Sequence, residues 1–128
     1  MSYFSDNYKY LSYPIETENS KGLRNAQIGA IHSIASYFTV HSKEPAIIVM
    51  PTGAGKTGVL FLSPFVLRST RVLVITPSKL VRNQISNGFE DLKVLIDNGA
   101  LPTDITKPKV KEISEVLDTQ EKWTELSK

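Results

Sequence analysis

The stretch that decides the fold is AIIVMPTGAGKTGVL, residues 46–60. Its first five residues (46–50, AIIVM) form a continuous apolar run, which is typical of a β-strand covered on both faces. A glycine-rich turn follows, and helical spacing of apolar residues then predicts a helix from Lys56 to about Leu67, with Pro64 expected to kink or shorten it. Strand, turn and helix in this order are the context that a phosphate-binding loop requires.

The turn, residues 50–57 (MPTGAGKT), has the residue types that phosphate binding needs. Gly53 and Gly55 allow backbone amides to curl around an anion, which a β-carbon would obstruct. Lys56 can place a positive charge against phosphate oxygens, and the Thr57 hydroxyl can complete the shell of a magnesium ion. The alternative interpretation is a glycine turn with a solvated lysine that binds no phosphate. The strict phosphate-loop pattern begins with glycine, whereas this chain has Met50 there, where a larger apolar residue can pack beneath the loop.

Working outward, further segments extend the pattern on both sides. Apolar residues at helical spacing predict a helix over about residues 23–40, and residues 71–75 (RVLVI) resemble the first strand. Thr76 and Pro77 end this second strand, and Ser78 is a plausible N-cap for the next helix. The alternation of strand and helix predicts an α/β fold, with a parallel sheet flanked by helices.

The two ends of the chain are less regular. Residues 1–22 are predicted to be an irregular arm, and residues 23–128 to be the domain proper. The arm's aromatic side chains could stack on a base, but docking on the domain surface is the favoured interpretation. Near the other end, four apolar residues suggest one amphipathic helix. They are Val110, Ile113, Val116 and Leu117.

Composition limits the number of cores and the classes of site that the chain can form. A chain of 128 residues with 41% hydrophobic side chains can build one core and not two. The absence of Cys excludes disulfide frameworks, thiolate zinc sites and cysteine nucleophiles. A formal net charge of +2 neither supports nor excludes nucleic acid as a partner. With no secretory signal and no apolar run near the roughly 20 residues of a membrane helix, we expect a cytoplasmic protein without a membrane partner.

Three segments together resemble a known family. PTGAGKT after an apolar residue is similar to motif I of superfamily 2 helicases and translocases, which include the DEAD/DEAH-box proteins and the motor subunits of type I and type III restriction enzymes. LRNAQIGAI, residues 23–31, resembles the LRxxQ element upstream of motif I. VLVITPSKLVRNQ, residues 72–84, resembles motif Ia. The three segments occur in the family's order.

The resemblance implies the fold and the ligands. It implies the N-terminal part of the first RecA-like domain, with ATP and Mg²⁺ as cofactors and the backbone of DNA or RNA as a partner, DNA being favoured. Gln27 would read the adenine edge, Thr57 would hold Mg²⁺, and Thr76, Pro77 and Ser78 would touch nucleic-acid phosphates. The residues expected to bind the nucleotide are Gln27, Thr52, Gly53, Ala54, Gly55, Lys56 and Thr57.

The sequence lacks the acidic motif of that family. Hydrolysis in the resembled proteins needs an Asp-Glu pair for magnesium and water, and this chain has no Asp-Glu dipeptide. We therefore expect nucleotide binding without hydrolysis by this chain alone, as part of a helicase truncated before that motif and completed by the remainder of the helicase. The alternative is a stand-alone nucleotide-binding module that pairs with a separate chain supplying the acids. A small kinase is a weaker alternative, since it would leave the Ia-like segment unexplained.

Overall fold

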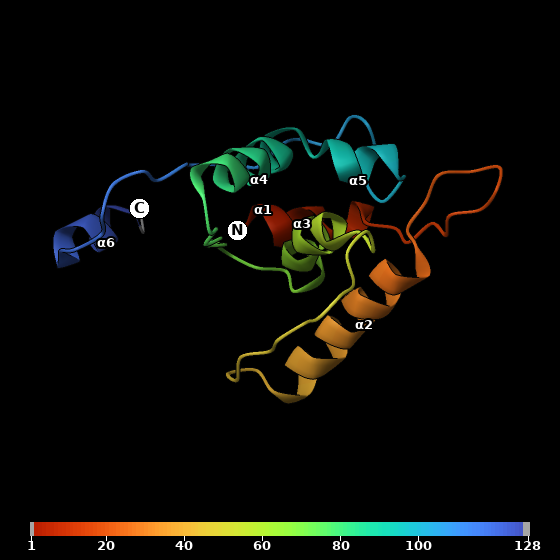
Figure 1. Ribbon diagram of the computed structural model, residues 1–128, viewed down its shortest axis with the longest axis horizontal. Coiled ribbons are helices and arrows are strands. Elements are labelled where there is room, and N and C mark those ends of the chain that lie inside the picture. Colours follow the sequence, from red (N-terminus) through yellow and green to blue (C-terminus); the bar gives the residue numbers. More distant parts are fainter. Residues whose placement is uncertain (1, 127–128) are drawn as a thin grey trace.

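The computed structural model describes residues 2–126, and in this range the regular structure is helical (Figure 1). The elements are α1 (Tyr3–Asn7), the 3₁₀ turn η1 (Tyr8–Tyr10), α2 (Asn25–Val40), α3 (Lys56–Val66), α4 (Lys79–Asp91), α5 (Lys93–Asp97) and α6 (Gln120–Leu126). No helix among these residues is long and apolar enough to cross a membrane.

The predicted α/β fold with a parallel sheet, a partial RecA-like P-loop domain, is wrong for this structure. Residues 46–50 and 71–75 contain no strand, and pairing within residues 2–126 is limited to isolated bridges in the arm. Ile47 is 92% exposed and Ile75 is 87% exposed, so neither segment is covered as a sheet strand would be. A β-branched apolar run favours the extended conformation, but a strand also needs a neighbour for its backbone hydrogen bonds, and neither segment has one here.

Helices α2 and α3 form the centre of the fold and pack against each other. Helix α2 buries Ile31 and Ile34, which lie three residues apart on one face. Helix α3 is apolar on most sides and ends at Val66, shortly after Pro64, as a proline inside a helix favours. The buried apolar residues are Phe4, Leu23, Ile31, Ile34, Met50, Val59, Phe61, Leu62, Phe65, Phe89, Leu92, Leu95, Ala100, Leu101 and Ile105.

The N-terminal arm is more ordered than its sequence predicts. Instead of an irregular segment, residues 3–10 form α1 and η1, and α1 packs on α3. Ser2 accepts a hydrogen bond from the Ser5 amide as the N-cap of α1. The docking interpretation is confirmed for Phe4, whose ring meets Phe65 edge to face with centroids 4.9 Å apart.

The C-terminal part also departs from expectation. The amphipathic helix predicted around Val110 to Leu117 is not formed, and the helix in this part of the chain is α6, further on. In Figure 1, α6 lies apart from the other helices at the end of a long extended connection. The outermost ends of the predicted segments 1–22 and 23–128, namely residue 1 and residues 127–128, lie outside the described residues.

Candidate functional site

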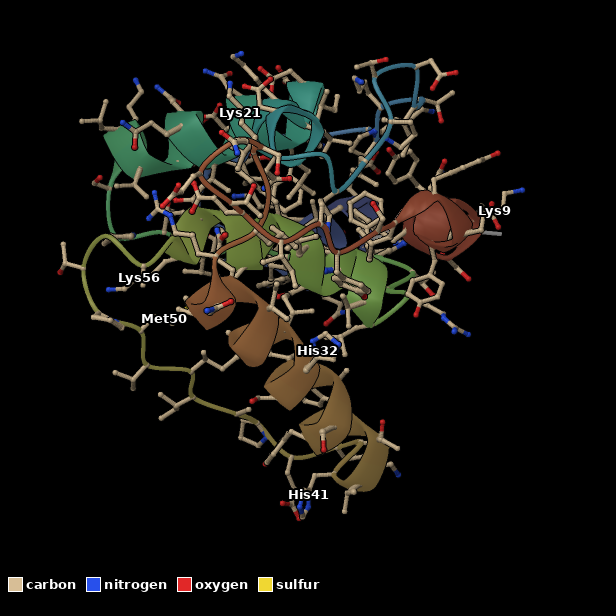
Figure 2. The ribbon with its side chains drawn as sticks, turned by 90° about the vertical axis from the view of Figure 1, so that its right-hand side faces the viewer. Lys9, Lys21, His32, His41, Met50 and Lys56 are labelled. Atoms are coloured by element: carbon tan, nitrogen blue, oxygen red, sulfur yellow. The ribbon has the colours of Figure 1, made fainter. Side chains whose placement is uncertain are left out.

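The predicted phosphate loop lies directly before α3. Gly55 is the residue that precedes the helix, with φ 91° and ψ 39°, and Gly53 has φ 82°. Both angles lie in the left-handed region that glycine tolerates best, which explains why the loop needs glycine at these positions. Lys56 and Thr57 form the first turn of α3 and are exposed. Figure 2 shows Lys56 near Met50, with its side chain directed away from the helices.

Two residues at the start of α2 hold the loop through its carbonyl groups. The Gln27 side chain donates from Nε2 to the Gly55 carbonyl oxygen at 3.1 Å, while its Oε1 accepts from the Arg24 amide at 2.9 Å. The Arg24 guanidinium donates to the Gly53 carbonyl oxygen and lies 3.8 Å from the Glu16 carboxylate. The structure therefore places Gln27 against the loop and buries it at 7% exposure, and its role in reading adenine stays a prediction.

The loop amides, in contrast, are left free. Within the described chain, the backbone N–H groups of Gly55, Lys56 and Thr57 have no hydrogen-bond partner, while the Ala54 amide donates to the Pro51 carbonyl at 3.2 Å. Consecutive free amides at a helix start, next to a lysine, make this stretch of backbone positively polarised. This arrangement fits the oxygen atoms of a phosphate group.

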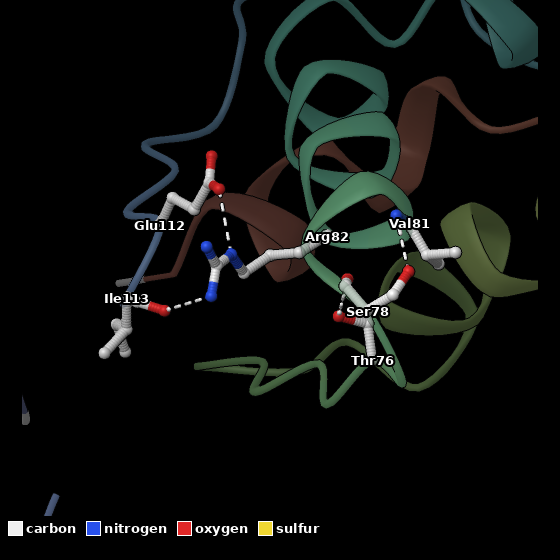
Figure 3. A network of polar contacts seen from close by, with 6 residues as sticks. All are labelled: Thr76, Ser78, Val81, Arg82, Glu112 and Ile113. Carbon is white, nitrogen blue, oxygen red and sulfur yellow. Dashed lines mark hydrogen bonds and ion pairs between the residues drawn. The ribbon is translucent and has the colours of Figure 1, made fainter. Parts of the chain in front are cut away.

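The second predicted site is the turn before α4 (Figure 3). Ser78 is the N-cap, as expected from the sequence: its Oγ accepts from the Val81 amide at 3.3 Å. The Thr76 hydroxyl donates to the Ser78 carbonyl at 3.3 Å, which orders the turn around Pro77. No hydrogen bond between described residues joins this turn to the phosphate loop, so the structure does not bring the two predicted sites into direct contact.

Acidic side chains are sparse around both segments. Residues 2–126 contain no group of three or more His, Cys, Asp or Glu side chains that could hold a metal ion. Near the 76–78 turn, the Glu112 carboxylate is paired with Arg82 at 2.9 Å, as Figure 3 shows. The residues of this loop that carry hydroxyl groups, which are possible magnesium ligands, are Thr52 and Thr57.

Sequence reasoning missed part of the loop's support. The sequence pattern includes Arg24 only as part of a motif, and the structure shows its guanidinium on the Gly53 carbonyl. Glu16 was not singled out, because its pairing with Arg24 depends on how the arm folds back beside α2. The parallel bridge between Ile15 and Leu23 marks that fold-back and carries no pattern in the sequence.

The comparisons with known proteins give one family. A family model described as "Type III restriction enzyme, res subunit" matches residues 20–124. No curated protein matches the chain, and no solved structure matches it.

Proposed function

Because the chain belongs to the family of the type III restriction enzyme res subunit, whose domain is helicase-like, we propose that it binds ATP with Mg²⁺ and contacts the nucleic-acid backbone as part of a restriction motor. Residues 1–22 serve as an arm, and residues 23–128 as part of the helicase ATP-binding domain. The observation that carries the proposal is the row of unpartnered amides at Gly55, Lys56 and Thr57.

Each loop residue has a role in holding the phosphates. The backbone of Thr52, Gly53, Ala54 and Gly55 surrounds the phosphate oxygens, and Lys56 supplies a positive charge to the terminal phosphates. Thr57 provides a hydroxyl ligand for Mg²⁺, which neutralises phosphate charge when it is bound. The contacts of Arg24 and Gln27 with loop carbonyls support this role, because they leave the amides free for an anion.

Gln27 recognises adenine in this proposal with the part of its amide that the protein does not use. One Nε2 hydrogen is committed to Gly55 and one Oε1 lone pair to Arg24, so a second donor and a second acceptor remain. We expect ATP to bind better than GTP, and Gln27→Ala to reduce that preference. Equal preference in both proteins would contradict the adenine role while leaving phosphate binding intact.

Calorimetric titration with ATP and Mg²⁺ tests the central claim. Lys56→Ala should weaken binding at least tenfold, while Lys43→Ala, which removes an exposed lysine outside the loop, should leave binding unchanged. We expect no steady hydrolysis by the chain alone, since it has no Asp-Glu dipeptide. Equal ATP affinity in wild type and Lys56→Ala would refute the proposal.

The turn at Thr76, Pro77 and Ser78 is the proposed contact to nucleic acid, with DNA favoured over RNA. A helix N-terminus with hydroxyl groups is suited to phosphate oxygens. Ser78→Asp keeps an N-cap acceptor and adds a negative charge, so it should weaken DNA binding without melting α4. Filter binding at several salt concentrations measures the change, and circular dichroism checks the helix.

A further inference from the structure

A groove runs between α4 and two extended segments, and it has a volume of about 1040 Å³. One wall is residues 70–78, and the other is residues 107–113. Figure 3 shows the second segment beside α4, tied to it through Arg82, which bonds both the Glu112 carboxylate at 2.9 Å and the Ile113 carbonyl at 3.1 Å. The volume lies slightly above the roughly 300–1,000 Å³ typical of small-molecule sites, which leaves room for a longer, extended ligand.

The first wall includes an extended segment, residues 71–75, that forms no strand in the described chain. No backbone N–H or C=O of residues 71–75 forms a hydrogen bond with another described residue. Leu73 and Ile75 are 56% and 87% exposed, although β-branched and aliphatic residues in this pattern favour a strand. A row of alternating donors and acceptors is the template on which an extended peptide adds as a strand.

The groove also has a defined chemical character. Its floor includes the apolar side chains of Ile85 and Phe89 from α4, with Val110 and Ile113 on the far wall. Its rim carries a set of basic side chains, whereas Glu112 is the one acidic residue among the described residues that line it and is paired with Arg82. The basic residues are Arg71, Lys79, Arg82, Lys107, Lys109 and Lys111.

From these observations we propose that the groove binds an extended apolar peptide segment with carboxylates at its ends, which pairs with residues 71–75 as an added β-strand. The apolar centre of the peptide covers Ile85 and Phe89, and its acidic ends meet the lysines of the rim. The proposal does not depend on nucleotide binding, because the groove shares no residue with the phosphate loop. It shares Thr76, Pro77 and Ser78 with the proposed nucleic-acid contact, so DNA is tested as a competitor.

Two other binding partners fit the groove less well. A nucleic-acid backbone satisfies basic side chains, but its phosphates are acceptors only and leave the carbonyl groups of residues 71–75 unpaired. A second copy of this chain would bring a second basic rim against the first, and like charges in contact oppose association. The acidic-ended peptide satisfies the apolar floor, the backbone groups of residues 71–75 and the charge together.

The test uses the full chain and a fluorescent peptide of sequence Asp-Asp-Val-Thr-Val-Thr-Val-Asp-Asp with blocked ends. We expect saturable binding, measured by anisotropy, and slower amide hydrogen exchange at residues 71–75. Exchanging the four Asp for Lys, or methylating alternate backbone nitrogens of the peptide, should weaken binding at least tenfold. The methylated peptide tests strand pairing without altering the protein.

Protein variants provide the matching control. Lys109→Glu with Lys111→Glu should weaken binding of the acidic peptide at least tenfold, while Lys21→Glu with Lys43→Glu, which changes the net charge equally at exposed sites outside the groove, should not. Absence of peptide binding, or equal binding of the methylated peptide, overturns the proposal. So does protection of residues 71–75 by single-stranded DNA that displaces the peptide, or by self-association of the chain alone.

Discussion

At the residue scale, Gly55 shows how narrowly one backbone position is specified. Its φ of 91° disfavours any side chain, and a β-carbon there would lie 2.3 Å from the Gln27 Nε2 atom. Gly55→Ala should therefore lower the free energy of unfolding by about 1–2 kcal/mol for the left-handed backbone, with more from the clash. Chemical denaturation measures this loss, and ATP affinity should fall with it.

Gly29→Ala is the matched control. Gly29 lies inside α2, and an added β-carbon meets no atom within 4 Å. Alanine is a better helix former than glycine by about 1 kcal/mol, so this variant should be stabilised. If both alanine variants changed stability in the same direction, the loop geometry at Gly55 would be incorrect.

Tyr3 gives a pH-dependent prediction. Burial raises the pKa of Tyr3 to about 12, and its hydroxyl donates to the Thr106 carbonyl. Because the folded-state pKa lies above the unfolded value near 10, the neutral tyrosine stabilises the fold fully below pH 10, and this stabilisation is lost as the pH rises toward 12. The free energy of unfolding, measured by denaturation at several pH values between 9 and 12, should depend less on pH for Tyr3→Phe than for wild type. An identical pH dependence would show that Tyr3 ionises as freely in the folded chain as in the unfolded one.

At the element scale, Phe4 is the buried side chain through which α1 packs on the core. Phe4 is 8% exposed and packs its ring on Phe65 and Phe89, with centroids 4.9 and 6.5 Å away. Phe4→Ala should lower the free energy of unfolding by about 3–5 kcal/mol, since it empties a buried aromatic position. Tyr10→Ala, at 50% exposure in the same arm, should cost far less. Thermal melts of the two variants separate the outcomes, and equal losses would contradict the docking of α1.

The elements also show what a sequence can predict. Helical periodicity located α2 and α3 to within a few residues, and Ser78 was correctly predicted as an N-cap, because these features depend on neighbouring residues. The sheet prediction failed for residues 46–50 and 71–75 because pairing depends on a distant partner that no local pattern encodes.

The candidate site likewise has features that the local sequence predicts and features that it does not. The need for glycine at positions 53 and 55 could be predicted from spacing, since the loop is contiguous and local geometry demands glycine, whereas the roles of Lys56 and Thr57 stay predictions. The burial of Gln27 and the contact of Arg24 with Gly53 could not, because both depend on the approach of α2 to α3.

At the scale of the whole molecule, we expect the exposed apolar segment 46–49 to promote self-association. Ile47 and Val49 are 92% and 88% exposed in an extended segment with free backbone groups, a combination prone to self-association. Ile47→Lys with Val49→Lys should reduce light scattering at high concentration without lowering the melting temperature. Val40→Lys, at a helix end with 74% exposure, is the control and should change scattering less. Unchanged scattering in the double variant would show that this segment does not drive association.

The N-terminal arm is hydrogen-bonded to a segment that lies 87 residues further along the chain. The Ser12 amide donates to the Ala100 carbonyl at 2.9 Å, and the Ser12 hydroxyl donates to the Gly99 carbonyl at 3.0 Å. During synthesis the arm leaves the ribosome before these partners, the nearer of which lies 87 residues further along the chain. Phe4 can be covered once Phe65 and Phe89 have emerged, but the hydrogen bonds of Ser12 must wait until translation has passed residue 100. Nascent-chain stages shorter than this should be digested by protease at the arm, which makes the order of synthesis part of how this domain reaches its folded state.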